Sequence, residues 1–260
     1  MSDVFFEILS PLPLNRHQDA RTLFQVWAEN AFHFLPDRWG LYEPLRHHFS
    51  LSNLDEAIRT WEFAYHAKRV AFPKLGSDIF MQYGPHRDHA TWTITLRNVK
   101  DFEQSAFCRL LERAAAVFSA DLGFIHKITE AEIPRGRANG SIGYLNTAHT
   151  QKNLFLVTHD LRKWLPDIYW MTAFGRPYVE LFSRERLLSC PAHSVKELEN
   201  GSIVIQLTPE LKDITAEEAA FERVRQEARN HLNNDAFFDV AKGMDYRYRV
   251  PEFVWGPIFH

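Results

Sequence analysis

Two histidines three positions apart have the spacing of a metal-ligand pair. His86 and His89 lie on either side of Asp88, in a segment that begins with a Gly-Pro turn signal. Imidazole nitrogens bind zinc, but a catalytic zinc ion needs a third protein ligand. Other histidines that could supply this ligand show no recognisable spacing: His47, His48 and His66. Because so short a motif is weak evidence, we expect a polar hairpin turn here. A metal-dependent hydrolase using His86 and His89 is the alternative.

No other spacing predicts catalysis. His159 and Asp160 could form a general base with an orienting carboxylate, but the chain has no G-x-S-x-G nucleophile elbow. Neither Cys108 nor Cys190 lies in an activating motif. The glycines around 136–140 match neither the dinucleotide-binding fingerprint nor the phosphate-binding P-loop. We therefore expect no enzymatic activity, no catalytic residue and no cofactor.

The segment from Pro209 to Asp239 is acidic. It holds eight Asp or Glu and four Lys or Arg, a formal charge of −4; the whole chain has −3, so the remainder is formally +1. A solvated helix with acidic residues in its first turn explains this without any function. The functional alternative is a face that steers the protein toward a basic partner. Its candidate contact residues are Glu210, Asp213, Glu217, Glu218 and Glu222.

Composition excludes several classes of protein. The 260 residues are 45% hydrophobic, 14% aromatic and 24% charged, as in a globular protein and unlike a disordered one. With 30 Lys and Arg against 33 Asp and Glu, the chain lacks the basic excess of nucleic-acid-binding proteins. Two cysteines, no signal-peptide pattern and no run of 18 apolar residues favour a cytoplasmic protein with no membrane partner.

Hydrophobic periodicity predicts an α+β fold with antiparallel sheets and helices packed on one face. The clearest strand is 90–96, where Trp92, Ile94 and Leu96 alternate with three threonines. Further strands are predicted at 4–9, 79–83, 123–129, 168–172, 194–198 and 202–207. Helices are predicted at 16–32, from 53 through 65, from 101 through 118, after 175 and from 215 through 232. Strands and helices do not alternate as in a parallel sheet, which favours the α+β class.

Breaker residues suggest a division of the chain. Gly, Pro and Asn are concentrated at 131–153, which we expect to connect an N-terminal lobe, 1–130, to a C-terminal lobe, 154–239. Each half has the order strand, helix, hairpin, helix, so the two lobes are expected to be similar. The tail, 240–260, is too aromatic to remain in water, and we expect it to dock on the body.

Residues 165–209 resemble bacterial polymorphic-toxin immunity proteins, and the immunity protein 52 family in particular. The resemblance rests on the run Leu165-Pro-Asp-Ile-Tyr-Trp-Met-Thr-Ala-Phe-Gly-Arg-Pro-Tyr-Val-Glu-Leu-Phe182, the hairpin ending at Pro209 and a later Asn234-Asp-Ala-Phe-Phe238. It covers about a third of the chain. Within the run, four residues are interpreted as determinants of the fold and not as partner contacts: Trp170, Phe174, Gly175 and Tyr178.

The resemblance implies an α+β antitoxin without enzymatic activity. Its partner would be a cognate protein toxin with a restriction-endonuclease-like nuclease domain, often delivered by type VI secretion. Inhibition by stoichiometric binding is therefore the predicted function. The alternatives are the hydrolase described above and an adaptor module of a secretion apparatus.

Overall fold

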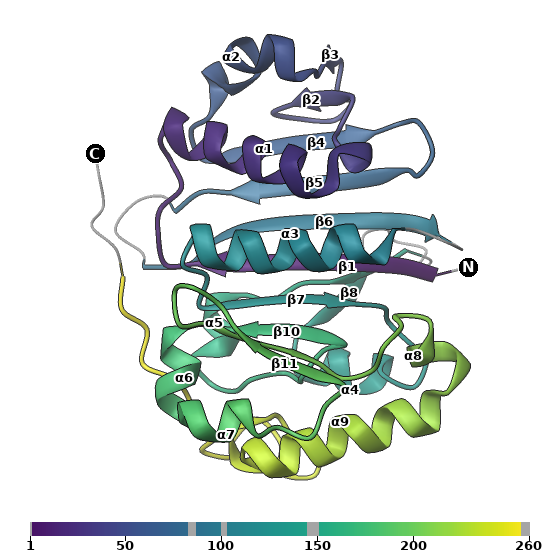
Figure 1. Ribbon diagram of the computed structural model, residues 1–260, viewed down its shortest axis with the longest axis vertical. Helices are drawn as coiled ribbons and strands as arrows, with labels where there is room; N and C mark the ends of the chain where they lie inside the picture. The colour runs from purple at the N-terminus through teal and green to yellow at the C-terminus, as the bar shows by residue number, and fades with distance from the viewer. Residues whose placement is uncertain (1, 83–86, 100–102, 145–150, 256–260) are drawn as a thin grey trace.

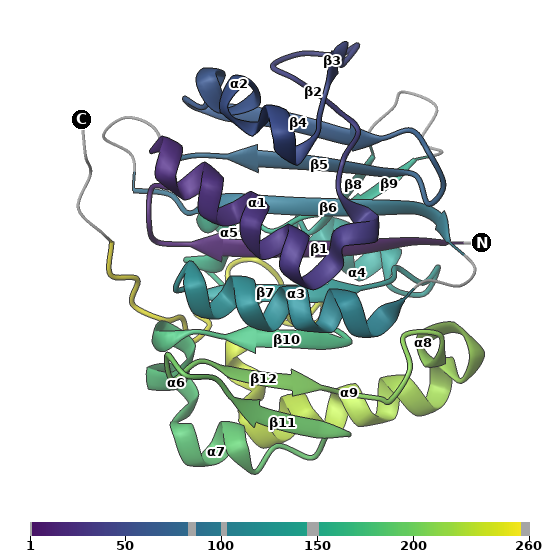
Figure 2. The same cartoon turned by 45° about the horizontal axis from the view of Figure 1, so that its top comes forward.

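One antiparallel sheet of ten strands organises the molecule (Figures 1 and 2). The computed structural model describes residues 2–82, 87–99, 103–144 and 151–255. In spatial order the strands are β11 (Ser194–Glu197), β12 (Ile203–Gln206), β10 (Met171–Phe174), β7 (Leu122–His126), β1 (Ser2–Ser10), β6 (Ala90–Val99), β5 (Leu75–Phe80), β4 (Ala64–Arg69), β2 (Arg38–Gly40) and β3 (His47–His48). A separate hairpin joins β8 (Ile142–Tyr144) to β9 (Lys152–Leu154). The predicted α+β class with antiparallel strands is confirmed.

Nine α-helices accompany the sheet in the described ranges. They are α1 (His17–Ala31), α2 (Leu54–Ala57), α3 (Gln104–Val117), α4 (Ile133–Ala138), α5 (Thr158–Leu161), α6 (Arg176–Phe182), α7 (Arg184–Leu188), α8 (Asp213–Ala216) and α9 (Glu218–Leu232). Short 3-10 turns lie at Phe32–Phe34, Leu51–Asn53, Ile58–Thr60 and Asn234–Ala236.

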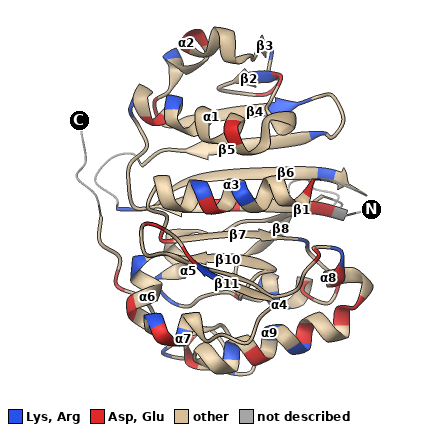
Figure 3. Ribbon diagram, viewed as in Figure 1, with Lys and Arg blue, Asp and Glu red and all other residues tan. Residues whose placement is uncertain are grey.

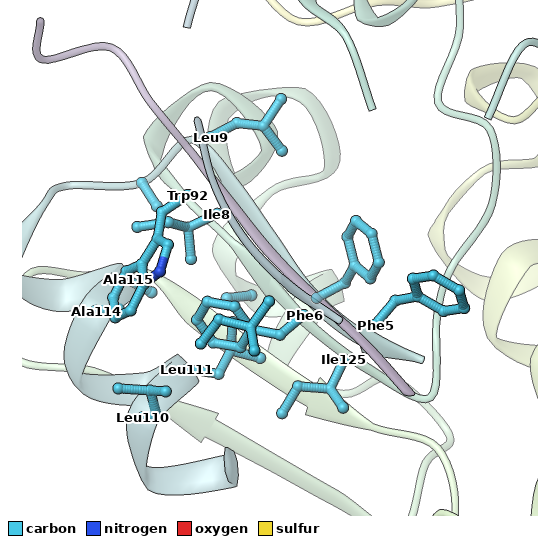
Figure 4. Close-up of a cluster of buried hydrophobic side chains, with 14 of the residues drawn as sticks. Phe5, Phe6, Ile8, Leu9, Trp92, Leu110, Leu111, Ala114, Ala115 and Ile125 are labelled. Atoms are coloured by element: carbon cyan, nitrogen blue, oxygen red, sulfur yellow. The ribbon is translucent and has the colours of Figure 1, made fainter. Parts of the chain in front are cut away.

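The long helices α1 and α3 cover one face of the sheet. Phe6 and Ile8 of β1 share with Trp92 and Ile94 of β6 the face toward these helices, whereas Phe5 and Leu9 lie on the other face, because side chains alternate along a strand. Figure 4 shows Phe6, Ile8 and Trp92 facing α3. The rings of Phe6 and Trp92 lie 5.3 Å apart, and that of Trp27 from α1 is 5.3 Å from Trp92. Large aromatic side chains thus fill this side of the core, each removing about 150–250 Å² from water.

The opposite face is covered mainly at its β7–β10–β12 end. His126, at the end of β7, packs against Phe221 of α9, with ring centroids 6.1 Å apart. Phe174 of β10 contacts Tyr178 and Phe182 of α6. Helices therefore pack on both faces of the sheet and not on one face, as the sequence predicted, because α9 and α6 cover the side that α1 and α3 leave open.

The sheet continues across the segment expected to separate two lobes. β7, from 1–130, pairs with β10, from 154–239, with Gly123 opposite Ala173. One cluster of buried hydrophobic residues extends through both parts. Segment 131–153 contributes α4 and β8 to the outside of this unit. The division into lobes stays a prediction about folding units, since the strands themselves form one sheet.

Several sequence-based element predictions differ from the structure. The strands expected at 79–83 and 168–172 are displaced, to 75–80 and 171–174. The helix expected from 53 through 65 ends early: α2 stops at Ala57, and Tyr65 lies in β4, where it is buried through strand alternation. The segment 33–51, for which the sequence analysis predicted no helix or strand, supplies β2 and β3, which are too short to show a period. The last long helix begins at Glu218, because the Thr215 hydroxyl donates to the Lys212 carbonyl instead of capping α9.

The aromatic tail lies along the body as far as residue 255 (Figure 1). Tyr248 is buried against Trp164 and Phe238. Phe253 contacts Tyr178, with ring centroids 6.3 Å apart. Phe259 falls outside the described residues. In the described part of the chain, no helix is long and apolar enough to cross a membrane.

Candidate functional site

Of the two histidines proposed as metal ligands, the structure describes only His89. Its Nε2 lies 3.0 Å from Oδ2 of Asp121, and its Nδ1 lies 2.9 Å from Oγ1 of Thr158. Both ring nitrogens are therefore engaged in hydrogen bonds. His86 lies outside the described residues. Within the described ranges, no group of three or more His, Cys, Asp or Glu is placed to hold a metal ion.

Thr158, His89 and Asp121 form a hydroxyl–imidazole–carboxylate chain, the order of groups found in nucleophilic hydrolases. The hydroxyl oxygen of Thr158 also accepts the main-chain N–H of His89 at 2.8 Å. All three residues are buried, and Phe253 and Trp255 of the tail pack on the imidazole. Burial raises the pKa of Asp121, an effect that His89 partly offsets. This geometry suits a clamp that ties the loop before β6 to α5 and β7. Sequence reasoning missed it because its members are distant in the chain.

The two thiols have environments that suppress reactivity. Burial raises the pKa of Cys108 to about 12 and that of Cys190 to about 12. A thiol must ionise to act as a nucleophile, so both side chains remain protonated near neutral pH.

A buried ionic network connects α9 to the sheet. Arg225 forms ion pairs with Glu132 and Glu222, and its Nη1 lies 3.7 Å from Oδ2 of Asp167. Nε2 of His126 lies 2.8 Å from Oε1 of Glu132. Burial alone would raise the pKa of Glu132, but His126 and Arg225 lower it well below its usual range.

Asp167 is the second anionic centre of this network. It pairs with Arg135, and Nη1 of Arg229 lies 3.6 Å from its Oδ1. Burial would raise the pKa of Asp167, but Arg225, Arg135 and Arg229 hold it below its usual range. The network therefore compensates its buried charges internally, which is the condition for keeping ions out of water.

This network changes the charge that α9 presents to solvent. Arg225 and Arg229, which oppose the acidic residues in the sequence count, point inward and are buried. Of the proposed contact residues, Glu210, Glu217 and Glu218 are exposed. Among the exposed residues of 217–232, the acids Glu217, Glu218 and Glu227 therefore outnumber the one Lys or Arg, which is Arg223. Figure 3 marks the acidic and basic positions along both helices.

The other two proposed contact residues are engaged within the chain. Oδ2 of Asp213 accepts the main-chain N–H of Glu210 at 2.9 Å, which closes the turn before α8. Glu222 is partly buried and pairs with Arg225. Any role of the acidic residues in partner contact therefore falls mainly on Glu210, Glu217 and Glu218.

The signature residues converge at the corner between β10 and α6. Trp170, Phe174, Gly175 and Tyr178 are all buried. The Trp170 indole Nε1 donates to the Thr208 carbonyl at 3.0 Å. A Cβ atom added at Gly175 would lie 2.0 Å from the Ala120 carbonyl oxygen. These four buried positions build this corner of the fold.

Comparison with known structures shows that the fold has been seen before. The Pseudomonas aeruginosa type VI secretion system (T6SS) protein PA0821 superposes on this chain with a TM-score of 0.55 and 9% sequence identity, covering 97% of this chain and 80% of that chain. The two chains share a fold. No protein-family model matches the sequence, and a search of curated proteins found no match. Membership of the immunity protein 52 family therefore stays a prediction.

Proposed function

We propose that this chain is an immunity protein that neutralises a cognate toxin by stoichiometric binding. The toxin carries a restriction-endonuclease-like nuclease domain and is delivered by type VI secretion. One observation carries the proposal: nearly the whole chain shares the fold of a T6SS protein. The sequence resemblance over 165–209 adds support, because its four signature residues build a single buried corner of that fold.

The exposed acidic residues of α8 and α9 supply a means of recognition. A nuclease must present basic residues to the phosphates of its substrate. Glu210, Glu217 and Glu218 would attract such a surface and raise the association rate. Lasting protection also needs slow dissociation, which calls for an interface of about 1,600 Å² or more. The acidic surface therefore guides the encounter, and a larger contact holds the complex.

The test uses the protein encoded next to this chain. Expression of that neighbour alone is expected to kill a bacterial host, and co-expression with the full-length chain to restore growth. The two proteins should co-purify in a fixed stoichiometry, measured by light scattering. If the neighbour is harmless, or if the chain binds it without restoring growth, the proposal is wrong.

A further inference from the structure

A pocket of about 470 Å³ opens on the face of the sheet opposite α1 and α3. Strands β1, β5 and β6 form one wall, and the segment from Asn153 to His159 forms the other. The volume falls within the roughly 300–1,000 Å³ typical of ligand-binding pockets. The pocket lies at the end of this face that α6 and α9 do not cover.

The polar lining contains three carboxylates beside two histidines, three threonines and one asparagine. Glu7 on β1 is opposite Thr93 on β6, which is opposite Asp78 on β5, so the three side chains share one row across the sheet. Asp88 lies nearby in the lining, and no Lys or Arg among the described residues lines the pocket. Glu7 is 2% exposed, whereas the side chains of Asp78 and Asp88 are 52% and 56% exposed. Glu7 therefore lies at the bottom and the two aspartates at the rim.

Glu7 differs from the rim aspartates because no cationic side chain among the described residues pairs with it. Asp78 lies 2.6 Å from Nδ1 of His66, and Asp88 lies 3.4 Å from Nη1 of Arg162. Oε2 of Glu7 accepts the main-chain N–H of Leu156 at 2.8 Å, and Glu7 forms no ion pair with any other described residue.

This environment disfavours the charged form of Glu7. Burial raises the pKa of Glu7 well above its usual range, and the Leu156 N–H offsets this only in part. Elsewhere in the molecule Arg225 compensates the buried Glu132, but no residue that the structure describes does so for Glu7. The amide oxygen of a glutamine would accept the Leu156 N–H equally well. Holding the segment around Leu156 in place therefore does not require a carboxyl group at position 7. Buried groups with perturbed ionisation inside a pocket are typical of functional sites.

Besides the two aspartates, the rim of the pocket carries exposed apolar side chains. Phe80 and Val157 line it and are 47% and 39% exposed, and Phe155 lies beside them. Exposed apolar side chains around a buried acid suit a guanidinium group, which is planar, weakly hydrated and able to stack on aromatic rings while pairing with a carboxylate. Arginine is also enriched among the residues that contribute most to protein interfaces.

We propose that this pocket receives an arginine side chain of a protein partner, whose guanidinium group pairs with Glu7. The identity of that partner as the toxin rests on the proposed function. The pairing supplies the positive charge that Glu7 lacks, while Phe80 and Val157 exclude water from the contact.

The first experiment tests the pocket without any partner protein. N-acetylarginine methylamide is titrated into the isotopically labelled full-length chain, and the backbone amide of Leu156 is followed by NMR. We expect saturable shifts with a dissociation constant on the order of 10 mM, as befits a single side chain. The uncharged isostere N-acetylcitrulline methylamide should cause none. The Glu7→Gln variant keeps an oxygen that accepts the Leu156 N–H, and it should bind the arginine compound at least tenfold more weakly. Equal shifts from both compounds, an unchanged Glu7→Gln response, or no saturable shift from the arginine compound would overturn the proposal.

The second experiment measures dissociation of the complex with the neighbouring toxin. Glu7→Gln is expected to raise the off-rate at least tenfold. The matched control is Glu29→Gln, at an exposed position on α1, and it should leave the off-rate unchanged. An unaltered off-rate for Glu7→Gln would refute the role of the pocket in partner binding. If the neighbour is not neutralised at all, the proposed function fails, while the NMR result still decides whether the pocket binds a guanidinium group.

Discussion

Replacing Gly175 by alanine probes the corner where β10 turns into α6. The added Cβ would lie 2.0 Å from the Ala120 carbonyl oxygen and 2.8 Å from Cα of Asp121, well inside the 3.0 Å that real Cβ contacts respect. Both neighbours are main-chain atoms, so no side-chain rotation relieves the clash. The φ of Gly175 is −82°, which any residue adopts, so the cost is one of space and not of backbone conformation.

The surrounding hydrogen bonds resist the required shift. The Gly175 N–H donates to the Asp121 carbonyl at 2.9 Å, and the Asp121 N–H donates to the Leu9 carbonyl at 2.9 Å. Moving this main chain apart by about 1 Å would strain both bonds. Overpacking costs about 1–3 kcal/mol, and a clash between main-chain atoms belongs at the upper end. For a chain of this size, ~3 kcal/mol corresponds to a fall in Tm of roughly 6–12 °C.

A matched control is available within the same sheet. A Cβ added at Gly76 in β5 meets no atom within 4 Å, so Gly76→Ala should change stability by less than about 1 kcal/mol. Unfolding of both variants is measured by urea titration with tryptophan fluorescence and by calorimetry. If Gly175→Ala melts within about 2 °C of Gly76→Ala, the signature corner is not the tight contact described here.

Three further predictions follow from the charged residues. Arg225→Met should lower the free energy of unfolding by about 3–5 kcal/mol in urea titrations, because it leaves buried carboxylates uncompensated; a loss below about 1 kcal/mol would contradict the network's role. The double variant Glu217→Lys, Glu218→Lys should slow association with the toxin about tenfold at low salt and much less at 0.5 M salt. The association rate is measured by stopped-flow fluorescence, and an unchanged rate at low salt would show that these residues of α9 do not guide association. The pKa of Glu7 is higher in the folded state than in the unfolded state. The free energy of unfolding of the wild type therefore falls as the pH rises from the pKa of Glu7 in the unfolded chain to its pKa in the folded chain. The free energy of unfolding of Glu7→Gln should therefore increase relative to that of the wild type as the pH rises from 4 to 8. If the difference between the two proteins stays constant over this range, Glu7 ionises equally easily in the folded and unfolded states.

The acidic segment shows why charge patterns in a sequence need the tertiary structure. Counting residues correctly located an acidic region around α8 and α9. The count could not separate Arg223, which is exposed, from Arg225 and Arg229, which are buried. Whether an arginine side chain points inward depends on the helix face that carries it and on whether a buried carboxylate lies opposite. The carboxylates that pair with Arg225 belong to Glu132 and Asp167, which are 93 and 58 positions away along the chain.

The sequence by itself determined the elements with a strong local period. The alternation of Trp92, Ile94 and Leu96 placed β6, and the apolar spacing in 16–32 placed α1. The Asn200-Gly201 turn was also predictable, since Gly201 adopts a φ of +81° that glycine tolerates.

Only the tertiary structure decided which elements meet. The pairing of β7 with β10, the clamp between His89 and Thr158, and the pocket around Glu7 join residues that are 46 to 149 positions apart. Periodicity shows that one face of an element is apolar, but it carries no information about which distant face will cover it. That choice is made by burying the most apolar surface across the whole chain at once, and here it brought Glu7 of the first strand beneath Leu156.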